Sequence, residues 1–177
     1  MPSELADAFD RMCRGLPHAS WVAPEDMHLT LSFLGSVDDE AFVDFGERLT
    51  SVRQSPFDLE LRGLGHFPPR GPVRQLWVGG CGGLGLDRLR RSVNACATDV
   101  GIPIGRRKFV PHVTIARFGT PPEEVRLASY LLRHSLVRMP PFPVSEFCLY
   151  SSFPSRVGTE HVLEAEYDFV AGTMTRQ

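Results

Sequence analysis

The 177-residue chain has a single lysine, four cysteines and little net charge. Its 19 basic residues are all arginines except Lys108, and 21 acidic residues balance them to a net charge of −2. That balance argues against a protein that binds nucleic acid through a global positive field. The arginine excess fits a biased genome, and it also fits phosphate recognition by guanidinium groups.

The sequence also lacks the usual marks of metal, membrane and nucleotide-loop proteins. The four cysteines form no CxxC pair and no zinc-knuckle spacing, so we expect buried free thiols and no metal or other cofactor. No apolar run is long enough to cross a membrane, and no signal-peptide pattern is present. We therefore predict a cytoplasmic, monomeric protein. Five glycines within 79–85 lack a phosphate-loop spacing and predict a flexible turn.

Hydrophobic periodicity predicts an α+β protein. Helical spacing covers 3–16, 38–53, 86–100 and 121–134, and alternation predicts strands over 27–34, 56–64, 73–79, 112–118, 144–151 and 161–169. A Pro/Gly-rich loop is expected from Phe67 to Pro72. The order of elements has no βαβ regularity, which favours largely antiparallel sheets. We expect one domain over 1–177, and a split into two lobes around one cleft stays open.

One internal similarity points to chemistry. The segment from His28 to Gly35 (HLTLSFLG) matches the segment from His112 to Gly119 (HVTIARFG) in its His-x-Thr opening, its aliphatic positions and its final glycine. On a strand, residues two apart share a face, so each motif would present an imidazole and a hydroxyl together. If the two strands are central in related half-sheets, these faces can meet across a groove.

Two imidazoles and two hydroxyls suit displacement at phosphorus. The reaction needs a base behind an attacking water and an acid on the leaving oxygen, and histidine can serve as either near neutral pH. The hydroxyls of Thr30 and Thr114 can donate to the nonbridging phosphate oxygens. A zinc site on His28 and His112 would need a third ligand that the sequence does not supply at a recognisable spacing.

The sequence resembles the two-histidine phosphoesterases, and within them the RNA 2',3'-cyclic phosphodiesterases, historically called 2'-5' RNA ligases. The resemblance covers nearly the whole chain. It is carried by the two motifs and by the segments 21–35 (WVAPEDMHLTLSFLG), 63–68 (GLGHFP), 76–79 (LWVG) and 109–117 (FVPHVTIAR).

This resemblance implies a bilobal fold with two pseudo-symmetric sheets, flanking helices and an active groove between the lobes. It implies metal-independent hydrolysis of RNA 2',3'-cyclic phosphate ends to 2'-phosphomonoesters. By that analogy His28 is the proton donor, His112 is the proton acceptor, and Thr30 and Thr114 bind phosphate. The residues alone do not distinguish this assignment from its reverse. Relatives usually begin with a strand ahead of the first helix, so we expect that strand to be absent here.

Weaker candidates surround the motifs. Arg117 lies three positions after Thr114, which predicts the opposite strand face unless the strand twists or ends there; an ion pair and a phosphate contact are both open. Phe67 could stack on a base, whereas core packing is favoured for Trp77. Tyr150, with Ser151 and Ser152, could line the groove. The basic cluster Arg106, Arg107 and Lys108 could be a solvated loop or an RNA contact.

The sequence leaves other functions open. The substrate could be a small cyclic phosphate instead of RNA, or the reaction could run in reverse as 2'-5' RNA ligation. A non-catalytic RNA- or nucleotide-binding module on the same fold is the alternative from another class, although such modules would be expected to lose one of the histidines.

Overall fold

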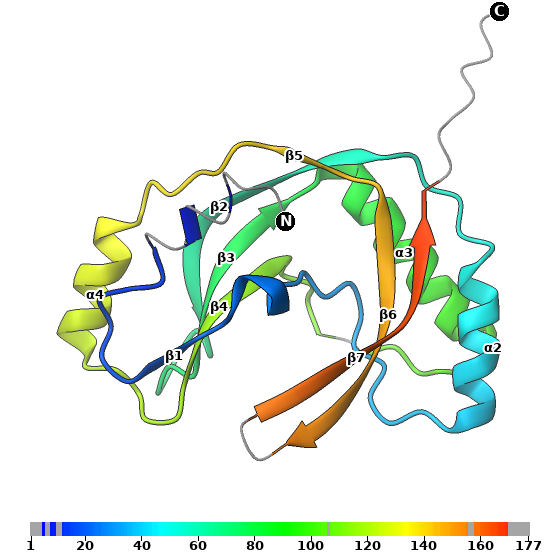
Figure 1. The fold of residues 1–177 in the computed structure, drawn as a ribbon, viewed down its shortest axis with the longest axis horizontal. Coiled ribbons are helices and arrows are strands. Elements are labelled where there is room, and N and C mark those ends of the chain that lie inside the picture. Colours follow the sequence, from blue (N-terminus) through cyan, green and yellow to red (C-terminus); the bar gives the residue numbers. More distant parts are fainter. Residues whose placement is uncertain (1–4, 6–7, 10–11, 106, 156–157, 170–177) are drawn as a thin grey trace, which may run out of the picture. The chain divides into compact units, whose positions relative to one another are not determined.

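The computed structural model describes residues 5, 8–9, 12–105, 107–155 and 158–169, and its fold is α+β (Figure 1). The helical elements are the 3-10 turn η1 (Pro24–Asp26), α2 (Asp39–Leu49), α3 (Gly83–Asp99) and α4 (Glu124–Arg133). The strands are β1 (Ala19–Trp21), β2 (Phe57–Phe67), β3 (Gln75–Cys81), β4 (His112–Phe118), β5 (Phe142–Val144), β6 (Glu146–Ser155) and β7 (Gly158–Asp168).

The chain forms two compact units, each assembled from three separate segments. The first unit contains Met1–Leu31, Leu59–Cys81 and Lys108–Phe142, and the second contains Ser32–Asp58, Gly82–Arg107 and Pro143–Gln177. The predicted α+β class with antiparallel sheets is confirmed. The expectation of a single domain stays a prediction.

A five-stranded sheet in the order β1-β4-β3-β2-β5 organises the first unit. The pairs β1–β4, β4–β3 and β3–β2 are antiparallel. One face of the central strands is buried, with Leu76, Val78 and Ile115 at 0% exposure. Strands β2 to β4 therefore fix the backbone of the residues that the opposite face carries.

The N-terminal helix follows its predicted pattern where it is described. Leu5, Ala8, Phe9 and Met12 are helical, and Leu5, Phe9 and Met12 are buried. Residues 3, 4, 6, 7, 10 and 11 of the predicted range 3–16 lie outside the described residues, and residues 13–16 are not helical, so the predicted end of this helix is wrong. In α4, the buried Tyr130 donates a hydrogen bond to the backbone carbonyl of Met12 at 2.5 Å. The prediction of the α4 helix is confirmed to within a few residues.

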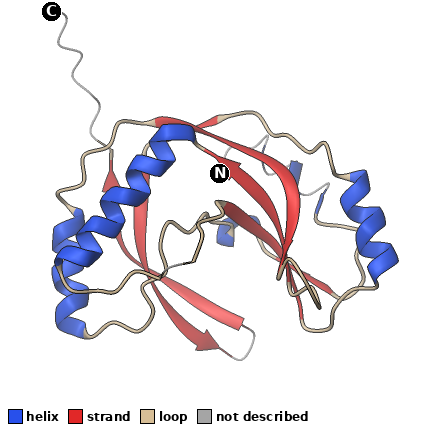
Figure 2. Ribbon diagram, turned by 180° about the vertical axis from the view of Figure 1, so that it is seen from behind, coloured by secondary structure: helices blue, strands red, loops and turns tan. Residues whose placement is uncertain are grey.

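The second unit packs helices on a two-stranded sheet of β6 and β7 (Figures 1 and 2). The hydroxyl of Tyr167 on β7 donates to the carbonyl of Gly46 on α2 at 2.9 Å, and Leu149 on β6 lies against the same glycine. Helix α2 begins at the predicted cap, where the Asp38 carboxylate accepts from the backbone N–H of Ala41. Both helices and both strands were predicted, with shifted ends.

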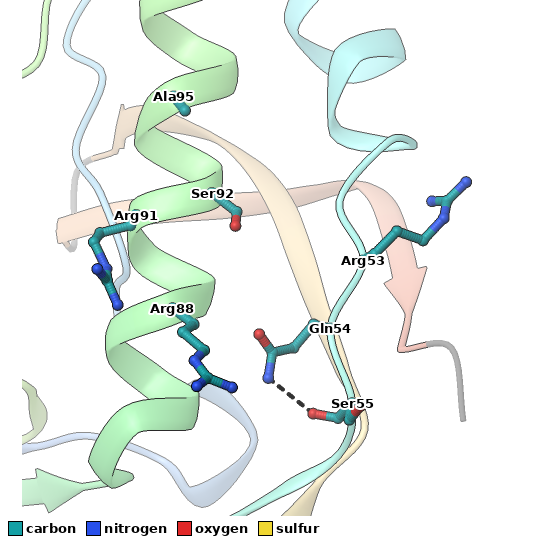
Figure 3. Close-up of a pocket in the computed structure, with 7 residues that line it drawn as sticks. All are labelled: Arg53, Gln54, Ser55, Arg88, Arg91, Ser92 and Ala95. Atoms are coloured by element: carbon teal, nitrogen blue, oxygen red, sulfur yellow. Dashed lines mark hydrogen bonds between the residues drawn. The ribbon is translucent and has the colours of Figure 1, made fainter. Parts of the chain in front are cut away.

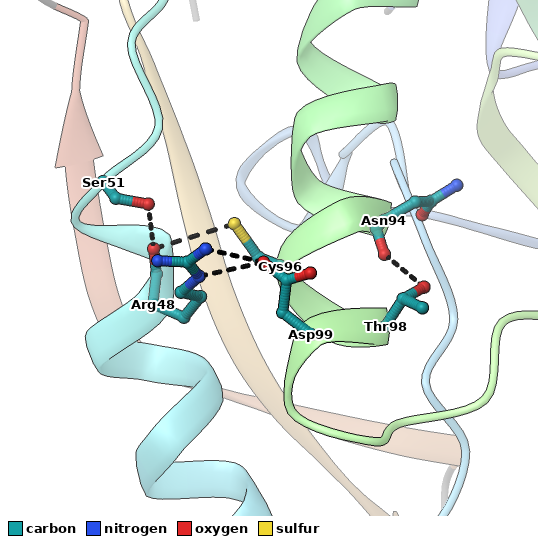
Figure 4. Close-up of polar contacts among 6 residues, drawn as sticks. All are labelled: Arg48, Ser51, Asn94, Cys96, Thr98 and Asp99. Atoms are coloured by element: carbon teal, nitrogen blue, oxygen red, sulfur yellow. Dashed lines mark hydrogen bonds and ion pairs between the residues drawn. The ribbon is translucent and has the colours of Figure 1, made fainter.

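The ends of α2 and α3 are joined by polar contacts (Figure 4). Arg48 near the end of α2 forms an ion pair with Asp99 at the end of α3, with an N–O distance of 2.7 Å. This pairing raises the pKa of the Arg48 guanidinium, chiefly through its hydrogen bond to Asp99. The thiol of Cys96 donates to the carbonyl of Arg48. All four cysteines are free thiols, but only Cys96 is fully buried.

The predicted strand over 27–34 is wrong. This segment forms a single antiparallel bridge, Leu29 to Val113, and is otherwise irregular. The reason is that β1 already pairs with β4 at Ala116–Phe118, and β4 begins at His112. Only a short length of the β4 edge is left for the segment to join. Sequence alternation did not predict the two short strands β1 and β5.

The predicted flexible turn over 79–85 is also wrong, because strand β3 runs through Cys81 and helix α3 begins at Gly83. Two of these glycines instead allow a neighbouring side chain to lie close to the backbone. A Cβ on Gly80 would lie 2.6 Å from Cδ1 of Leu29, and one on Gly85 would lie 2.5 Å from the ring of Phe57. Real Cβ atoms do not come so near, so these positions let neighbouring side chains pack on bare backbone.

Candidate active site

The two His-x-Thr motifs meet at the edge of β4. The bridge between Leu29 and Val113 is antiparallel, so the residues that flank it oppose each other across the bridge. His28 therefore lies across from Thr114, and Thr30 lies across from His112. Leu29 and Val113 point to the core face, where Leu29 contacts Gly80 and Val113 is 6% exposed. The four motif side chains thus share the opposite face of the sheet.

The two imidazoles make the same backbone contact. Nδ1 of His28 lies 2.7 Å from the carbonyl oxygen of Asp26, and Nδ1 of His112 lies 2.7 Å from that of Val110. A carbonyl can only accept, so in each ring Nδ1 carries the proton and donates it. In a neutral ring with this arrangement, Nε2 is the nitrogen without a proton. His28 is exposed, while Thr30, His112 and Thr114 are half-buried.

Strands β3 and β2 continue this face beyond the motifs. Gly79 is opposite His112, and Trp77 is opposite Thr114. On β2, Arg62 pairs with Gly79 and Gly65 pairs with Trp77. A Cβ on Gly79 would lie 2.8 Å from the backbone oxygen of Arg62, so a larger residue does not fit between His112 and Arg62.

An aromatic cluster surrounds His112. The ring centroid of His112 lies 5.0 Å from Phe67 in an edge-on arrangement and 5.9 Å from Trp77, and the Phe67 and Trp77 rings are 5.3 Å apart. The indole of Trp77 lies over Gly65, where a Cβ would be 2.2 Å from the ring. The expectation that Trp77 packs in the core is therefore corrected: it is half-buried on the face that carries His112.

A bulge in β4 decides where Arg117 points. Leu76 pairs with Ala116, but the next residue, Trp77, pairs with Thr114, so β4 holds one extra residue. The consecutive residues Ile115 and Ala116 are both fully buried as a result. The alternation then resumes with the opposite phase, and Arg117 is exposed on the face of His112 and Thr114. The predicted placement of Arg117 on the other face is wrong because spacing alone does not reveal a bulge.

The sequence did not single out two other polar residues on this face. Gln75 pairs with Arg117, and Arg62 lies across Gly79 from His112. Arg62 is 3.8 Å from Glu60, which also holds Arg138. The alternation of Leu59, Glu60, Leu61 and Arg62 in a predicted strand could have indicated that Arg62 lies on the polar face.

Tyr150 and the basic cluster, which the sequence also offered as site residues, do not belong to strands β2 to β4, and neither do two histidines outside the motifs. Tyr150 belongs to the second unit, on β6, and is 48% exposed; burial of its hydroxyl raises its pKa. Arg107 and Lys108 are exposed, and Arg106 lies outside the described residues. The ring of His161 contacts Ser152, and His134 ends α4, where burial lowers its pKa.

The described part of the chain has neither a cluster of metal-ligating side chains nor a helix that could span a membrane. No group of three or more His, Cys, Asp or Glu residues there could hold a metal ion. No described helix is both long enough and apolar enough to cross a bilayer.

Known proteins resemble the chain over most of its length. An RNA 2',3'-cyclic phosphodiesterase of Aeropyrum pernix is 44% identical over 97 residues, 54% of this chain and 55% of that protein. A relative of the same name from Geobacillus stearothermophilus is 40% identical over 66% of this chain and 39% of its own length. The chain thus matches about half of the first relative and less of the second. A Thermotoga maritima relative of that name is 32% identical over 87% of this chain and 81% of its own.

Solved structures share the fold. TT0787 of Thermus thermophilus superposes with a TM-score of 0.78 at 24% identity, covering 98% of this chain and 96% of that one. Escherichia coli LigT in complex with 3'-AMP superposes with a TM-score of 0.70 at 25% identity, covering 96% and 93%. The family model for LigT-like phosphoesterases matches residues 1–77 and 83–159. The chain therefore belongs to the LigT-like phosphoesterase family.

Proposed function

We propose that the chain hydrolyses the 2',3'-cyclic phosphate end of RNA to a 2'-phosphomonoester, using His28 and His112 as its acid–base pair and no metal ion. The observation that carries the proposal is the antiparallel bridge at Leu29 and Val113, which opposes each motif histidine to the threonine of the other motif. The names of the relatives, RNA 2',3'-cyclic phosphodiesterase, support the substrate class.

The reaction needs one proton to enter and one to leave. Nε2 of His112 takes a proton from water as the water oxygen bonds to phosphorus. The bond from phosphorus to the 3'-oxygen breaks, and Nε2 of His28 supplies that oxygen with a proton. The product carries a 3'-hydroxyl and a 2'-phosphate. His28 enters this step as an imidazolium and leaves it neutral, and His112 does the reverse, so the exchange of protons with solvent restores both rings. In each ring Nδ1 donates to the carbonyl of Asp26 or Val110, which leaves the proton transfer to Nε2.

The side chains around the two histidines have distinct roles in the proposed reaction. The hydroxyls of Thr30 and Thr114 donate to the nonbridging phosphate oxygens as charge redistributes. The bulge that brings Arg117 to this face supplies a guanidinium, which can pair with those oxygens in a bidentate manner. Phe67, at the edge of His112, offers a ring for a terminal base. Tyr150, which lies on β6, stays a predicted substrate contact.

The decisive experiment uses the full chain in EDTA with a short RNA that ends in a 2',3'-cyclic phosphate. We expect conversion to the 2'-phosphate by the wild type and a loss of at least about 100-fold in His28→Ala and in His112→Ala, since general acid–base catalysis contributes that much. His18→Ala, outside both motifs, is the matched control and should retain full activity. A folded wild type that leaves the RNA unchanged would contradict the proposal.

A modified substrate separates the two roles. Replacing the bridging 3'-oxygen by sulfur gives a leaving group that departs without a proton, because a thiolate is far more stable than an alkoxide. If His28 is the acid, His28→Ala regains most of its activity on this substrate and His112→Ala does not. The reverse result would exchange the two assignments.

The alternatives give other results in the same assay. A cyclic mononucleotide turned over as fast as the oligonucleotide would indicate a small cyclic phosphate as substrate. Joining of a 5'-hydroxyl RNA to the cyclic end would indicate 2'-5' ligation. Binding without turnover by the folded protein would indicate the non-catalytic binding module.

A further inference from the structure

A hollow on the second unit carries arginines that the proposed chemistry does not use (Figure 3). It has a volume of about 550 Å³ and lies between helix α3 and the segment that joins α2 to β2. Polar groups make up most of its lining: Arg53, Gln54, Ser55, Arg88, Arg91, Ser92 and Ala95.

The residues that helix α3 contributes to the hollow lie on one face of the helix. Arg88, Arg91, Ser92 and Ala95 follow the three- and four-residue spacing that places side chains in neighbouring turns. In Figure 3 the side chain of Arg88 extends toward Gln54, whereas Arg91 and Arg53 stand at opposite sides of the hollow. All three arginines are exposed. The positive charge is therefore spread along the hollow.

These arginines have no acidic partner. The salt bridges found among the described residues involve Arg48, Arg62, Arg126 and Arg138, and none involves the three arginines of the hollow. Arg53 donates to the carbonyls of Thr50 and Val52, and Arg91 donates to that of Asp87. These contacts orient the side chains through neutral carbonyl groups. None of the described residues that line the hollow carries a carboxylate.

Such a lining fits a chain of phosphates better than a single small anion. Guanidinium groups bind phosphate oxygens in pairs, and the hydroxyls of Ser55 and Ser92 with the amide of Gln54 add neutral donors. No described aromatic side chain lines the hollow, so it offers no platform for stacking a base. Recognition here is thus of backbone charge, without a preference for sequence.

We propose that this hollow binds the phosphodiester backbone of single-stranded RNA at a site separate from the two histidines. The proposal rests on the proposed function for its choice of RNA as the polyanion. It gives the second unit a contact with RNA that depends on charge alone and requires no cyclic end.

The test is the affinity for RNA that cannot react. A fluorescent 20-nucleotide RNA with a 3'-hydroxyl end is titrated with the full chain, and binding is followed by anisotropy at several salt concentrations. For Arg88→Gln/Arg91→Gln we expect Kd to rise about tenfold or more at low salt. The logarithmic salt dependence should become shallower by about 1.4, since each lost contact to a single strand removes about 0.7.

The control removes the same charge elsewhere. Arg126→Gln/Arg133→Gln takes two exposed arginines from α4 and should leave Kd within about twofold of the wild type. Arg53→Glu, on the other wall of the hollow, should weaken binding independently of the α3 variant. A thermal melt of each variant shows that it is folded.

The outcomes separate this site from the catalytic proposal. Equal losses in the two double variants, or an unchanged salt dependence, would overturn the RNA-binding hollow even if cyclic ends are hydrolysed. Stronger competition by inorganic polyphosphate than by unlabelled RNA of equal charge would overturn the choice of RNA. A protein that fails to hydrolyse cyclic ends yet shows the predicted losses would refute the catalytic proposal and support the hollow.

Discussion

Gly65 is the residue on which the surroundings of His112 depend. The indole of Trp77 lies across the bare backbone of Gly65, where a Cβ would be 2.2 Å from the ring. Trp77 in turn contacts both Phe67 and His112. A single methyl group at Gly65 must therefore displace the indole and alter the packing of the histidine ring.

We expect Gly65→Ala to destabilise the protein by about 1–3 kcal/mol, the usual cost of overpacking, and to lower kcat on a cyclic-ended RNA. Urea unfolding and steady-state kinetics measure the two effects. Gly119→Ala is the control, because a Cβ there meets no atom within 4 Å.

Combining Gly65→Ala with Trp77→Leu tests the cause. The double variant should lose less stability than the sum of the single variants, because the smaller side chain relieves the clash. Strict additivity would show that Trp77 is not what the new methyl group meets.

At this scale the sequence predicted the motif residues and little of their surroundings. A repeated His-x-Thr pattern is visible in the amino-acid sequence. The backbone carbonyls at Asp26 and Val110 that orient the rings are not, because any residue supplies a carbonyl. The face of Arg117 depends on the extra residue at Ile115 and Ala116, and strict alternation predicts the opposite face.

At the scale of elements, the bond from Tyr130 joins α4 to the N-terminal helix. Its hydroxyl donates to the carbonyl of Met12, and burial raises the pKa of Tyr130 above its ordinary value, so the donor keeps its proton. The Met12 carbonyl also accepts from the backbone N–H of Arg14, so Tyr130→Phe removes one of its two donors and should cost about 0.5–1.5 kcal/mol.

Chemical denaturation measures this cost. Tyr150→Phe is the matched control, because Tyr150 is 48% exposed and its change should stay within about 0.5 kcal/mol. Equal stabilities of the two variants would mean that water replaces Tyr130 at the Met12 carbonyl.

Helices were predicted better than strands for a physical reason. The buried residues Phe45 and Leu49 of α2, and Leu86, Leu89 and Val93 of α3, follow a period that one helix satisfies by itself. A strand needs a neighbour with free backbone groups. The segment 27–34 alternates well, yet β1 already pairs with Ala116–Phe118 at the β4 edge, and of this segment only Leu29 pairs.

At the scale of the whole molecule, the two units are interleaved along the chain. Helices α2 and α3 of the second unit precede the hairpin β6–β7 in the chain. Tyr167 and Leu149 of this hairpin pack against Gly46 of α2. A chain shortened to residues 1–142 keeps both helices and loses that hairpin. Helices of 11 and 17 residues are marginal alone in water.

We therefore expect α2 and α3 to unfold in the 1–142 chain. Amide hydrogen exchange should show rapid exchange over 39–49 and 83–99, compared with slow exchange in the full chain. Continued protection of these two segments would contradict the expectation and would mean that the helices stabilise each other without the hairpin.

The bridge at Leu29 and Val113 has a consequence for regiochemistry. A half-turn about that bridge exchanges His28 with His112 and Thr30 with Thr114. A cyclic phosphate presented to these four side chains alone would meet the same groups in either orientation, and either ester bond could break. The rings of Phe67 and Trp77 stand beside His112. Under the proposed function, the choice between a 2'-phosphate and a 3'-phosphate product rests on groups that break this symmetry, such as these two rings and the guanidinium of Arg117, and not on the histidines.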